Sequence, residues 1–217
     1  MTGHGPRNVD GLNRFSKLWQ SSLLPQAPDQ SEQIYARLAA AYSEPHRYYH
    51  TMDHINYCLG QLDLCRSEVD NADAIEMAIW FHDVIYQPGN PDDERQSAAL
   101  YADLAKGVHS DHFISQVYEM IIATIHDGES LQHSDNKYMV DIDLSSFALD
   151  WDAFVQDSEN LRLENPHVEA GEYQRRQKKF RESLLARERF FYTDFFHQRY
   201  EQQARKNLQR CYQQPCD

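Results

Sequence analysis

The sequence predicts an all-α protein, and three observations support this prediction. The chain contains only 8 glycines and 8 prolines among 217 residues, so few positions interrupt long helices. Apolar residues recur at spacings of three and four along most of the chain, as they do in amphipathic helices. No stretch shows the sustained alternation of apolar and polar residues that is typical of a half-buried strand. With 41% hydrophobic residues, the chain can bury one sizeable core.

Proline, glycine and helix-capping residues divide the chain into segments. Residues 1–13 carry glycine, proline and polar residues without periodicity, and we expect them to form a disordered tail ahead of one domain at 14–217. The sequence Pro-Gly-Asn-Pro at residues 88–91 is a strong turn signal. Helices are expected at about residues 12–24, 29–43, 51–65, 71–86, 92–107, 111–128, 139–149, 151–165 and 169–213.

The charge and the cysteines restrict the classes of partner. A net charge of -13 and a pI of about 5.2 disfavour binding to a nucleic-acid polymer or to an anionic membrane. The four cysteines show no CxxC spacing, which argues against a zinc knuckle. Because no signal peptide and no membrane-spanning apolar run is found, we expect a cytoplasmic protein.

One stretch, AIWFHDVIY at residues 78–86, places a histidine and an aspartate inside an apolar run. On a helix, His82 shares a stripe with Ile75 and Ile79, and Asp83 lies beside that stripe. An unpaired buried carboxylate costs several kcal/mol. Consecutive helical side chains diverge, so His82 and Asp83 are not expected to contact each other, but both could reach one cation. The alternative is a buried pair satisfied by hydrogen bonds to other groups.

Three further segments contain histidines or aspartates at suggestive positions. His50 and His54 are four residues apart and share one face of a helical turn, although a pair of surface histidines would look the same. Asp143 lies within an apolar stripe, whereas Asp141 has polar helical neighbours and is the expected solvent-facing acid. His126 lies on the apolar face of its predicted helix, where a histidine satisfied within the core is an equal alternative.

Together these segments supply nitrogen and oxygen ligands of the kind that bind Mn, Fe, Mg, Co, Ni or Zn. The candidate ligands are His54, His82, Asp83 and Asp143. The sequence contains no HExxH, no glycine-rich phosphate loop and no GxSxG. The ExxH at Glu164 to His167 includes Pro166 at a helix break, which argues against a ferritin-like di-iron bundle.

The ordered set of motifs resembles the HD superfamily of metal-dependent phosphohydrolases, helical proteins named for an adjacent His-Asp pair. It looks like a bacterial branch of predicted metal-dependent HD phosphohydrolases, over nearly the whole chain after about Leu24. The matching motifs are Tyr-His-x-x-x-His-Ile at 49–55, Phe-His-Asp at 81–83, Glu-x-x-Ser-Ala at 94–98, Thr-x-His at 124–126, Asp-x-Asp-Leu at 141–144 and Ala-Arg-x-Asn-Leu at 204–208. The resemblance implies a single HD-domain-like helical bundle, with a metal-binding core at about 42–150 and additional C-terminal helices at about 151–213.

The resemblance also implies roles for individual residues. It matches His54, His82, Asp83 and Asp143 to the ligands of one or two divalent ions. His126 matches the position of a further ligand in binuclear HD proteins. His50 matches the general acid of the related cyclic-nucleotide phosphodiesterases. Where close relatives tend to have Arg-x-Glu-Tyr, this chain has Arg-Leu-Glu-Asn at 162–165, so a role for that segment is not implied.

The expected function is hydrolysis of a small phosphomonoester or phosphodiester, nucleotides included, by a metal-activated water. Glu94 is a candidate for orienting water or a histidine, with a solvated acid after a turn as an equal alternative. Arg47 is a candidate for binding phosphate. The basic run at residues 175–181 is more simply explained as a solvated helix face. The expected partner is a small phosphorylated substrate, and the chain could also form a homodimer. The alternatives are an HD-type di-iron oxygenase and a non-catalytic metal-binding helical module.

Overall fold

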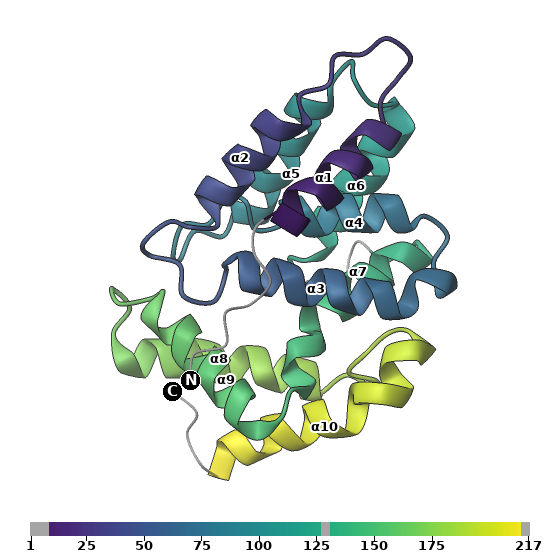
Figure 1. Cartoon of the computed structure of the whole chain (residues 1–217). Coiled ribbons are helices and arrows are strands. Elements are labelled where there is room, and N and C mark those ends of the chain that lie inside the picture. The colour runs from purple at the N-terminus through teal and green to yellow at the C-terminus, as the bar shows by residue number, and fades with distance from the viewer. Residues whose placement is uncertain (1–8, 127–130, 214–217) are drawn as a thin grey trace.

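The computed structural model describes residues 9–126 and 131–213, and within these ranges the chain is helical without any strand, which confirms the predicted all-α class (Figure 1). None of the described helices is both long and apolar enough to cross a membrane. The α-helices are α1 (Val9–Ser21), α2 (Ser31–Ala41), α3 (Met52–Cys65), α4 (Ala72–Phe81), α5 (Asp93–Ala105), α6 (Asp111–Ala123), α7 (Ser134–Leu144), α8 (Trp151–Leu163), α9 (Ala170–Leu185) and α10 (Asp194–Gln213). Two 3-10 helices, η1 (Arg66–Glu68) and η2 (Ser145–Ala148), extend α3 and α7.

Helix α4 occupies the centre of the molecule. It packs against α1, α3, α5, α6 and α7, and every residue from Ala74 to Phe81 is buried. This burial explains why its sequence is apolar on all sides rather than along one stripe. Figure 1 shows α1, α2, α5 and α6 on one side of α3 and α4, with α8, α9 and α10 on the other side.

Local signals set the beginnings of the helices that hold the candidate site. The Thr51 side chain accepts a hydrogen bond from the Asp53 N–H and caps α3, and the Asn71 side chain accepts from the Ala74 N–H and caps α4. The expected turn between α4 and α5 is also present, where Gly89 has a φ of 85°, a conformation that glycine adopts without strain.

Several predicted helix boundaries and part of the predicted tail were wrong. Helix α1 begins at Val9, so residues 9–13 belong to a helix that packs on α2 and α4, whereas residues 1–8 lie outside the described residues. Helix α4 ends at Phe81 and α6 ends at Ala123, several residues before the predicted ends at about 86 and 128. The predicted C-terminal helical region divides into α9 and α10.

Asp141 connects α7 to the segment that precedes α10. It was predicted to face solvent, but its exposed fraction is 0%. Its carboxylate accepts hydrogen bonds from the backbone N–H groups of Tyr192 and Thr193, at 2.8 and 2.7 Å, and from the Thr193 hydroxyl at 2.7 Å. The prediction was wrong because helical periodicity reports only neighbours on the same helix, and here a distant segment covers the polar face of α7.

Candidate metal centre

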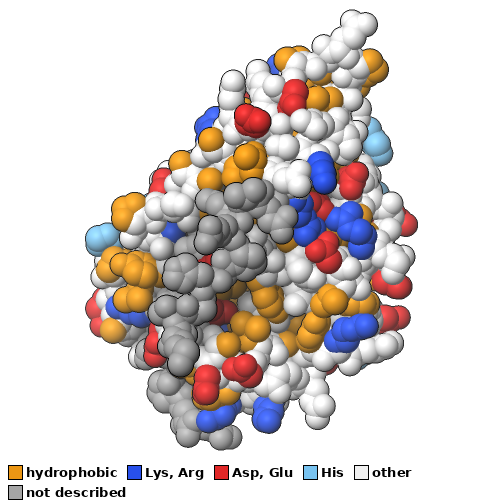
Figure 2. All heavy atoms as spheres, in the orientation of Figure 1, with side chains coloured by type: hydrophobic (Ala, Val, Ile, Leu, Met, Phe, Trp, Pro, Cys, Tyr) orange, Lys and Arg blue, Asp and Glu red, His pale blue; other side chains and the backbone are white. Residues whose placement is uncertain are grey.

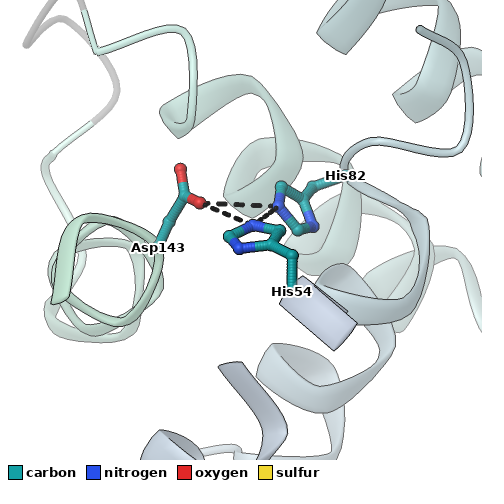
Figure 3. A group of neighbouring side chains, drawn as sticks. All are labelled: His54, His82 and Asp143. Atoms are coloured by element: carbon teal, nitrogen blue, oxygen red, sulfur yellow. Dashed lines mark hydrogen bonds and ion pairs between the residues drawn. The ribbon is translucent and has the colours of Figure 1, made fainter. Parts of the chain in front are cut away.

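His54, His82 and Asp143 come together from α3, the end of α4 and α7 (Figure 3). The two Nε2 atoms lie 3.3 Å apart. Asp143 Oδ1 lies 3.2 Å from His54 Nε2 and 3.6 Å from His82 Nε2. The structure therefore groups three of the four predicted ligands into a set that could hold a metal ion. His54, His82 and Asp143 together form the metal-ligand group.

The dimensions of this group fit a single ion. Nitrogen and oxygen ligands bind ions such as zinc at about 2.0–2.2 Å, which places ligand atoms roughly 2.8–3.6 Å from one another. The three separations within the group lie in this range. Both histidines are buried, with exposed fractions of 6% for His54 and 1% for His82. The mixed nitrogen and oxygen donors are compatible with several divalent metals, so they do not select one.

The end of α4 orients His82. Its backbone N–H donates to the Ala78 carbonyl at 2.8 Å, so the residue completes the last turn of the helix. Its ring Nδ1 lies 2.9 Å from the Ile79 carbonyl oxygen, which can only accept, so Nδ1 carries a proton. The other nitrogen, Nε2, thereby faces Asp143 and His54. Carbonyl groups in the last turn of a helix lack intrahelical partners, which makes this position suitable for orienting a histidine.

Asp83 lies beside the group. Its Oδ2 is 2.9 Å from His82 Nε2 and 3.6 Å from His54 Nε2. The prediction that His82 and Asp83 cannot contact each other was wrong, because it assumed that the helix continues through both residues. Helix α4 ends at Phe81, so Asp83 lies in a turn and its side chain points back toward His82.

Charge and burial act in opposite directions on these groups. Burial raises the pKa of both Asp83 and Asp143, but the surrounding histidines outweigh it and hold both pKa values below the ordinary range. Burial likewise lowers the pKa of His82, and the two carboxylates outweigh it and raise that pKa well above its ordinary value. Both acids are therefore ionised at neutral pH, which is the form in which a carboxylate binds a cation.

His126 contacts the other oxygen of Asp143. Its Nε2 lies 3.0 Å from Asp143 Oδ2. It was predicted to lie on a helical face, but α6 ends at Ala123 and His126 has a φ of 62° in the following turn. Its Nδ1 is buried without a hydrogen-bond partner among the described residues. Asp143 thus has one oxygen directed at His54 and His82 and the other at His126.

His50 is paired with a residue to which the sequence assigned no role. Glu164 Oε2 lies 2.6 Å from His50 Nδ1, and the exposed fraction of Glu164 is 0%. Its other oxygen, Oε1, accepts hydrogen bonds from the backbone N–H groups of Tyr48, Tyr49 and His50 at 2.8, 2.8 and 2.9 Å. Burial raises the pKa of Glu164, but the contacts with His50 and the backbone outweigh it and lower that pKa to about 2.

His50 lies close to the metal-ligand group without belonging to it. The centroids of the His50 and His54 rings are 6.2 Å apart, and the His50 ring stacks on Tyr86 at 4.2 Å. Burial lowers the pKa of His50, but the carboxylates of Asp83 and Glu164 outweigh it and leave that pKa raised. The arrangement therefore places a histidine with a raised pKa beside the candidate metal ligands.

Arg47 does not have the position expected of a phosphate-binding residue. Its side chain has an exposed fraction of 0%. Nη1 donates to the carbonyls of Asp83 and His50, at 2.7 and 3.2 Å, and Nη2 donates to the Val84 carbonyl at 2.9 Å. This guanidinium holds the turn after α4 against the segment before α3, and a role in phosphate binding stays a prediction.

Glu94 and the basic run at 175–181 can also be placed. Glu94 is half-buried in the first turn of α5, outside the metal-ligand group. Burial and the charge of Asp83 outweigh the charge of His126, so the pKa of Glu94 is raised. Its role stays a prediction. In the basic run, the exposed Arg175 and Arg176 both pair with Glu172, at 2.8 and 2.7 Å, as expected for a solvated helix face.

Comparison with known proteins finds no relative of this chain. No protein-family model matches the sequence, and no match was found among curated proteins or among solved structures. The resemblance to the HD superfamily therefore depends on its motifs alone, and membership stays a prediction.

Proposed function

We propose that this protein is a metal-dependent phosphohydrolase that acts on a small phosphate monoester or diester, nucleotides included. The observation that supports this proposal is the proximity of two arrangements. The His54-His82-Asp143 group, in which both histidines are buried, could hold a metal ion, and the His50-Glu164 pair beside it would supply a candidate proton donor.

The two parts would have separate tasks. A divalent ion held by His54, His82 and Asp143, with Asp83 beside them, would supply a Lewis acid that polarises a phosphoryl oxygen and lowers the pKa of a bound water. Glu164 accepts a hydrogen bond from the Nδ1–H of His50, which fixes the ring and leaves Nε2 to hold a second proton. His50 would give that proton to the departing oxygen of the substrate. Arg47 would contribute indirectly, because it fixes the backbone of both His50 and Asp83.

A second candidate is a di-iron oxygenase. The contact between His126 and the second oxygen of Asp143 supports it, because a carboxylate with histidines at both oxygens could bridge two ions. Glu94 lies within electrostatic reach of His126 but is not grouped with it. The hydrolase is the better supported of the two, since the His50-Glu164 pair suits a reaction that needs a proton donor.

The test combines metal analysis with a substrate panel. The whole chain is stripped with a chelator, reloaded with Mn, Fe, Mg, Co, Ni or Zn, and assayed on nucleotides, sugar phosphates and phosphodiesters. We expect ester hydrolysis that requires the added metal and disappears in His82→Ala. The control Asp152→Asn changes an exposed acid of α8 and should retain full activity.

Two results would contradict the hydrolase. Stoichiometric metal without turnover of any ester would indicate a non-catalytic metal-binding module. Two irons per chain together with an oxygen-dependent absorption spectrum would indicate the oxygenase.

A further inference from the structure

A small pocket adjoins the metal-ligand group on the side of α8 and α9. It has a volume of about 30 Å³ and is lined by the segment before α3, by η2, and by α8 and α9. Figure 2 shows Lys and Arg side chains interspersed with Asp and Glu on the face that it displays, so surface charge there does not single out a place for substrate. The pocket offers a place, beside the candidate centre, where one ester could be distinguished from another.

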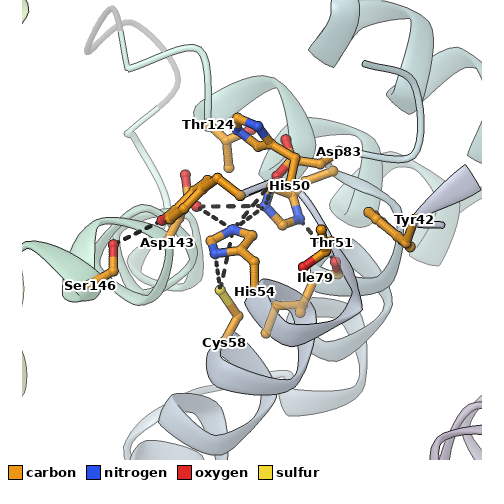
Figure 4. A network of polar contacts seen from close by, with 12 residues as sticks. Tyr42, His50, Thr51, His54, Cys58, Ile79, Asp83, Thr124, Asp143 and Ser146 are labelled. Atoms are coloured by element: carbon orange, nitrogen blue, oxygen red, sulfur yellow. Dashed lines mark hydrogen bonds and ion pairs between the residues drawn. The ribbon is translucent and has the colours of Figure 1, made fainter. Parts of the chain in front are cut away.

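Two residues connect the pocket to the metal-ligand group. Tyr49 lines the pocket, and its ring centroid is 4.9 Å from that of His54. The Tyr49 hydroxyl is 3.0 Å from Ser146 Oγ, and Ser146 also lines the pocket. Ser146 follows Asp143 by three residues and lies beside it (Figure 4). An ester whose phosphate reached the metal-ligand group could therefore extend its alcohol part toward the pocket.

Asp157 brings an unpaired carboxylate into this pocket. It lines the pocket from the middle of α8 and is half-buried. Its carboxylate has no hydrogen-bond or ion-pair partner among residues 9–126 and 131–213. Burial raises the pKa of Asp157 to about 6, although the charge of His54 lowers it, so the acid lies within electrostatic reach of the candidate centre. An ionised carboxylate can only accept hydrogen bonds, so the group that it lacks is a donor.

We infer that Asp157 determines specificity for the alcohol part of the substrate, by accepting a hydrogen bond from a hydroxyl or ammonium group that enters this pocket. The inference rests on the proposed hydrolase and names its substrate class, which is phosphate esters of small alcohols that carry a second donor group. A water molecule needs roughly 10–15 Å³ of such a cavity, so a pocket of about 30 Å³ admits a hydroxyl or an ammonium group. The base of a nucleotide would have to lie outside it.

The lining of the pocket does not choose between the two donors by charge alone. Phe147 and Phe154 contribute aromatic rings, which attract an ammonium group, whereas Arg181 repels one. Both donors can bond to the carboxylate of Asp157, so each forms an arm of the test.

The test compares esters of matched size on the whole chain, reloaded with the metals of the hydrolase assay. The alcohol parts of n-propyl, 2-hydroxyethyl and 2-aminoethyl phosphate have the same number of non-hydrogen atoms and end in a methyl, a hydroxyl or an ammonium group. We expect kcat/KM for at least one of the two donor esters to exceed that for n-propyl phosphate by about 10-fold or more, the factor that a hydrogen bond to a charged group supplies.

Two substitutions of Asp157 separate the acceptor from its charge. Asp157→Leu removes the acceptor and should bring the three esters within about twofold of one another. This variant should fold, because the carboxylate has no partner to lose. Asp157→Asn keeps an acceptor oxygen without the charge, so it should abolish a preference for ammonium and retain part of a preference for hydroxyl. The control Asp152→Leu, on the exposed face of α8, should keep the wild-type preference.

A binding measurement separates this inference from hydrolysis. In n-butyl, 3-hydroxypropyl and 3-aminopropyl phosphonate a methylene group replaces the ester oxygen, and their dissociation constants can be measured by calorimetry. Binding of a donor phosphonate about 10-fold tighter than that of n-butyl phosphonate, with the difference lost in Asp157→Leu, would support the inference even if no ester were hydrolysed.

Two results would overturn the inference. Ester hydrolysis with equal kcat/KM for the three ends, or with a preference that Asp157→Leu leaves unchanged, would overturn it and leave the hydrolase in place. A chain that hydrolyses no ester and shows no Asp157-dependent difference in phosphonate binding would overturn both.

Discussion

Glu164 Oε2 lies 2.6 Å from His50 Nδ1. This contact joins the end of α8 to the segment just before α3, and the two residues are 114 positions apart in the sequence. The same carboxylate accepts three backbone hydrogen bonds from residues 48–50 and is fully buried. One side chain therefore fixes the ring of His50 and the backbone that carries it. Its removal should affect both proton transfer and stability, and the two effects can be measured separately.

For catalysis, we predict that Glu164→Gln lowers kcat by about 100-fold, because general acid catalysis typically contributes a factor of that order or more. Metal content should be unchanged, since Glu164 is not in the metal-ligand group. The lost negative charge should also lower the pKa of His50, so the alkaline limb of the pH-rate profile should move to lower pH. The control Glu159→Gln, on the exposed surface of α8, should leave the profile unchanged.

For stability, the direction of the pH dependence follows from the pKa of Glu164, which is lowered from 4.5 to about 2. A lowered pKa in the folded state stabilises the protein above the unfolded value of 4.5, and this stabilisation is lost as the pH falls toward 2. A difference of 2.5 pKa units corresponds to about 3 kcal/mol.

The measurement is urea unfolding of wild type and Glu164→Gln at pH 5.5 and pH 3.0. We expect the difference in the free energy of unfolding between the two proteins to be larger at pH 5.5. A difference that grows as the pH falls would show that the carboxylate is not stabilised in the folded state.

Much of the fold could be predicted because the signals for helix starts are local. Thr51 and Asn71 cap the helices that they were expected to begin, and the turn around Gly89 is present. The helix ends were less predictable. The apolar run of α4 continues past Phe81, so periodicity alone gives no reason to end the helix before His82. The chain leaves the helix there, and this turn brings Asp83 back against His82.

The candidate site was predictable only where a residue type was unusual in its own segment. His82 and Asp143 are polar within apolar stripes, and the structure groups them. Glu164 has no comparable local signal, because its partners are more than 100 residues away. Asp141 was misplaced for a related reason, since the residues that cover it come from the segment before α10.

The two aspartates of α7 provide a direct comparison between ligand and structural roles. Asp143→Asn should lose bound metal while it retains the fold, because its carboxylate faces the histidines and keeps a similar shape as an amide. Asp141→Asn should retain metal but lose about 3 kcal/mol of unfolding free energy, because an amide nitrogen would face buried N–H donors. Metal analysis and urea unfolding of both variants test this. Loss of metal in folded Asp141→Asn with retention in Asp143→Asn would reverse the assignment.

A substitution of Arg47, the basic residue beside the candidate site, tests whether this side chain is structural or binds substrate. Its Nη1 and Nη2 donate to three backbone carbonyls, and its guanidinium lies over the rings of Tyr42 and Tyr86, at 5.3 and 5.5 Å from their centroids. Lysine keeps the charge but cannot reproduce these divergent hydrogen bonds. We therefore predict that Arg47→Lys loses about 2–3 kcal/mol of unfolding free energy, since it leaves buried carbonyls unpaired.

For the folded fraction of Arg47→Lys, KM for a phosphate ester should stay within about twofold of the wild-type value, because a fully buried guanidinium cannot reach substrate. Urea unfolding gives the stability, and initial rates normalised to folded protein give KM. Unchanged stability together with a KM raised tenfold or more would instead assign Arg47 to the substrate. The guanidinium would then have to release the carbonyls of His50, Asp83 and Val84 when substrate binds, so the turn at Asp83 and Val84 would have to open.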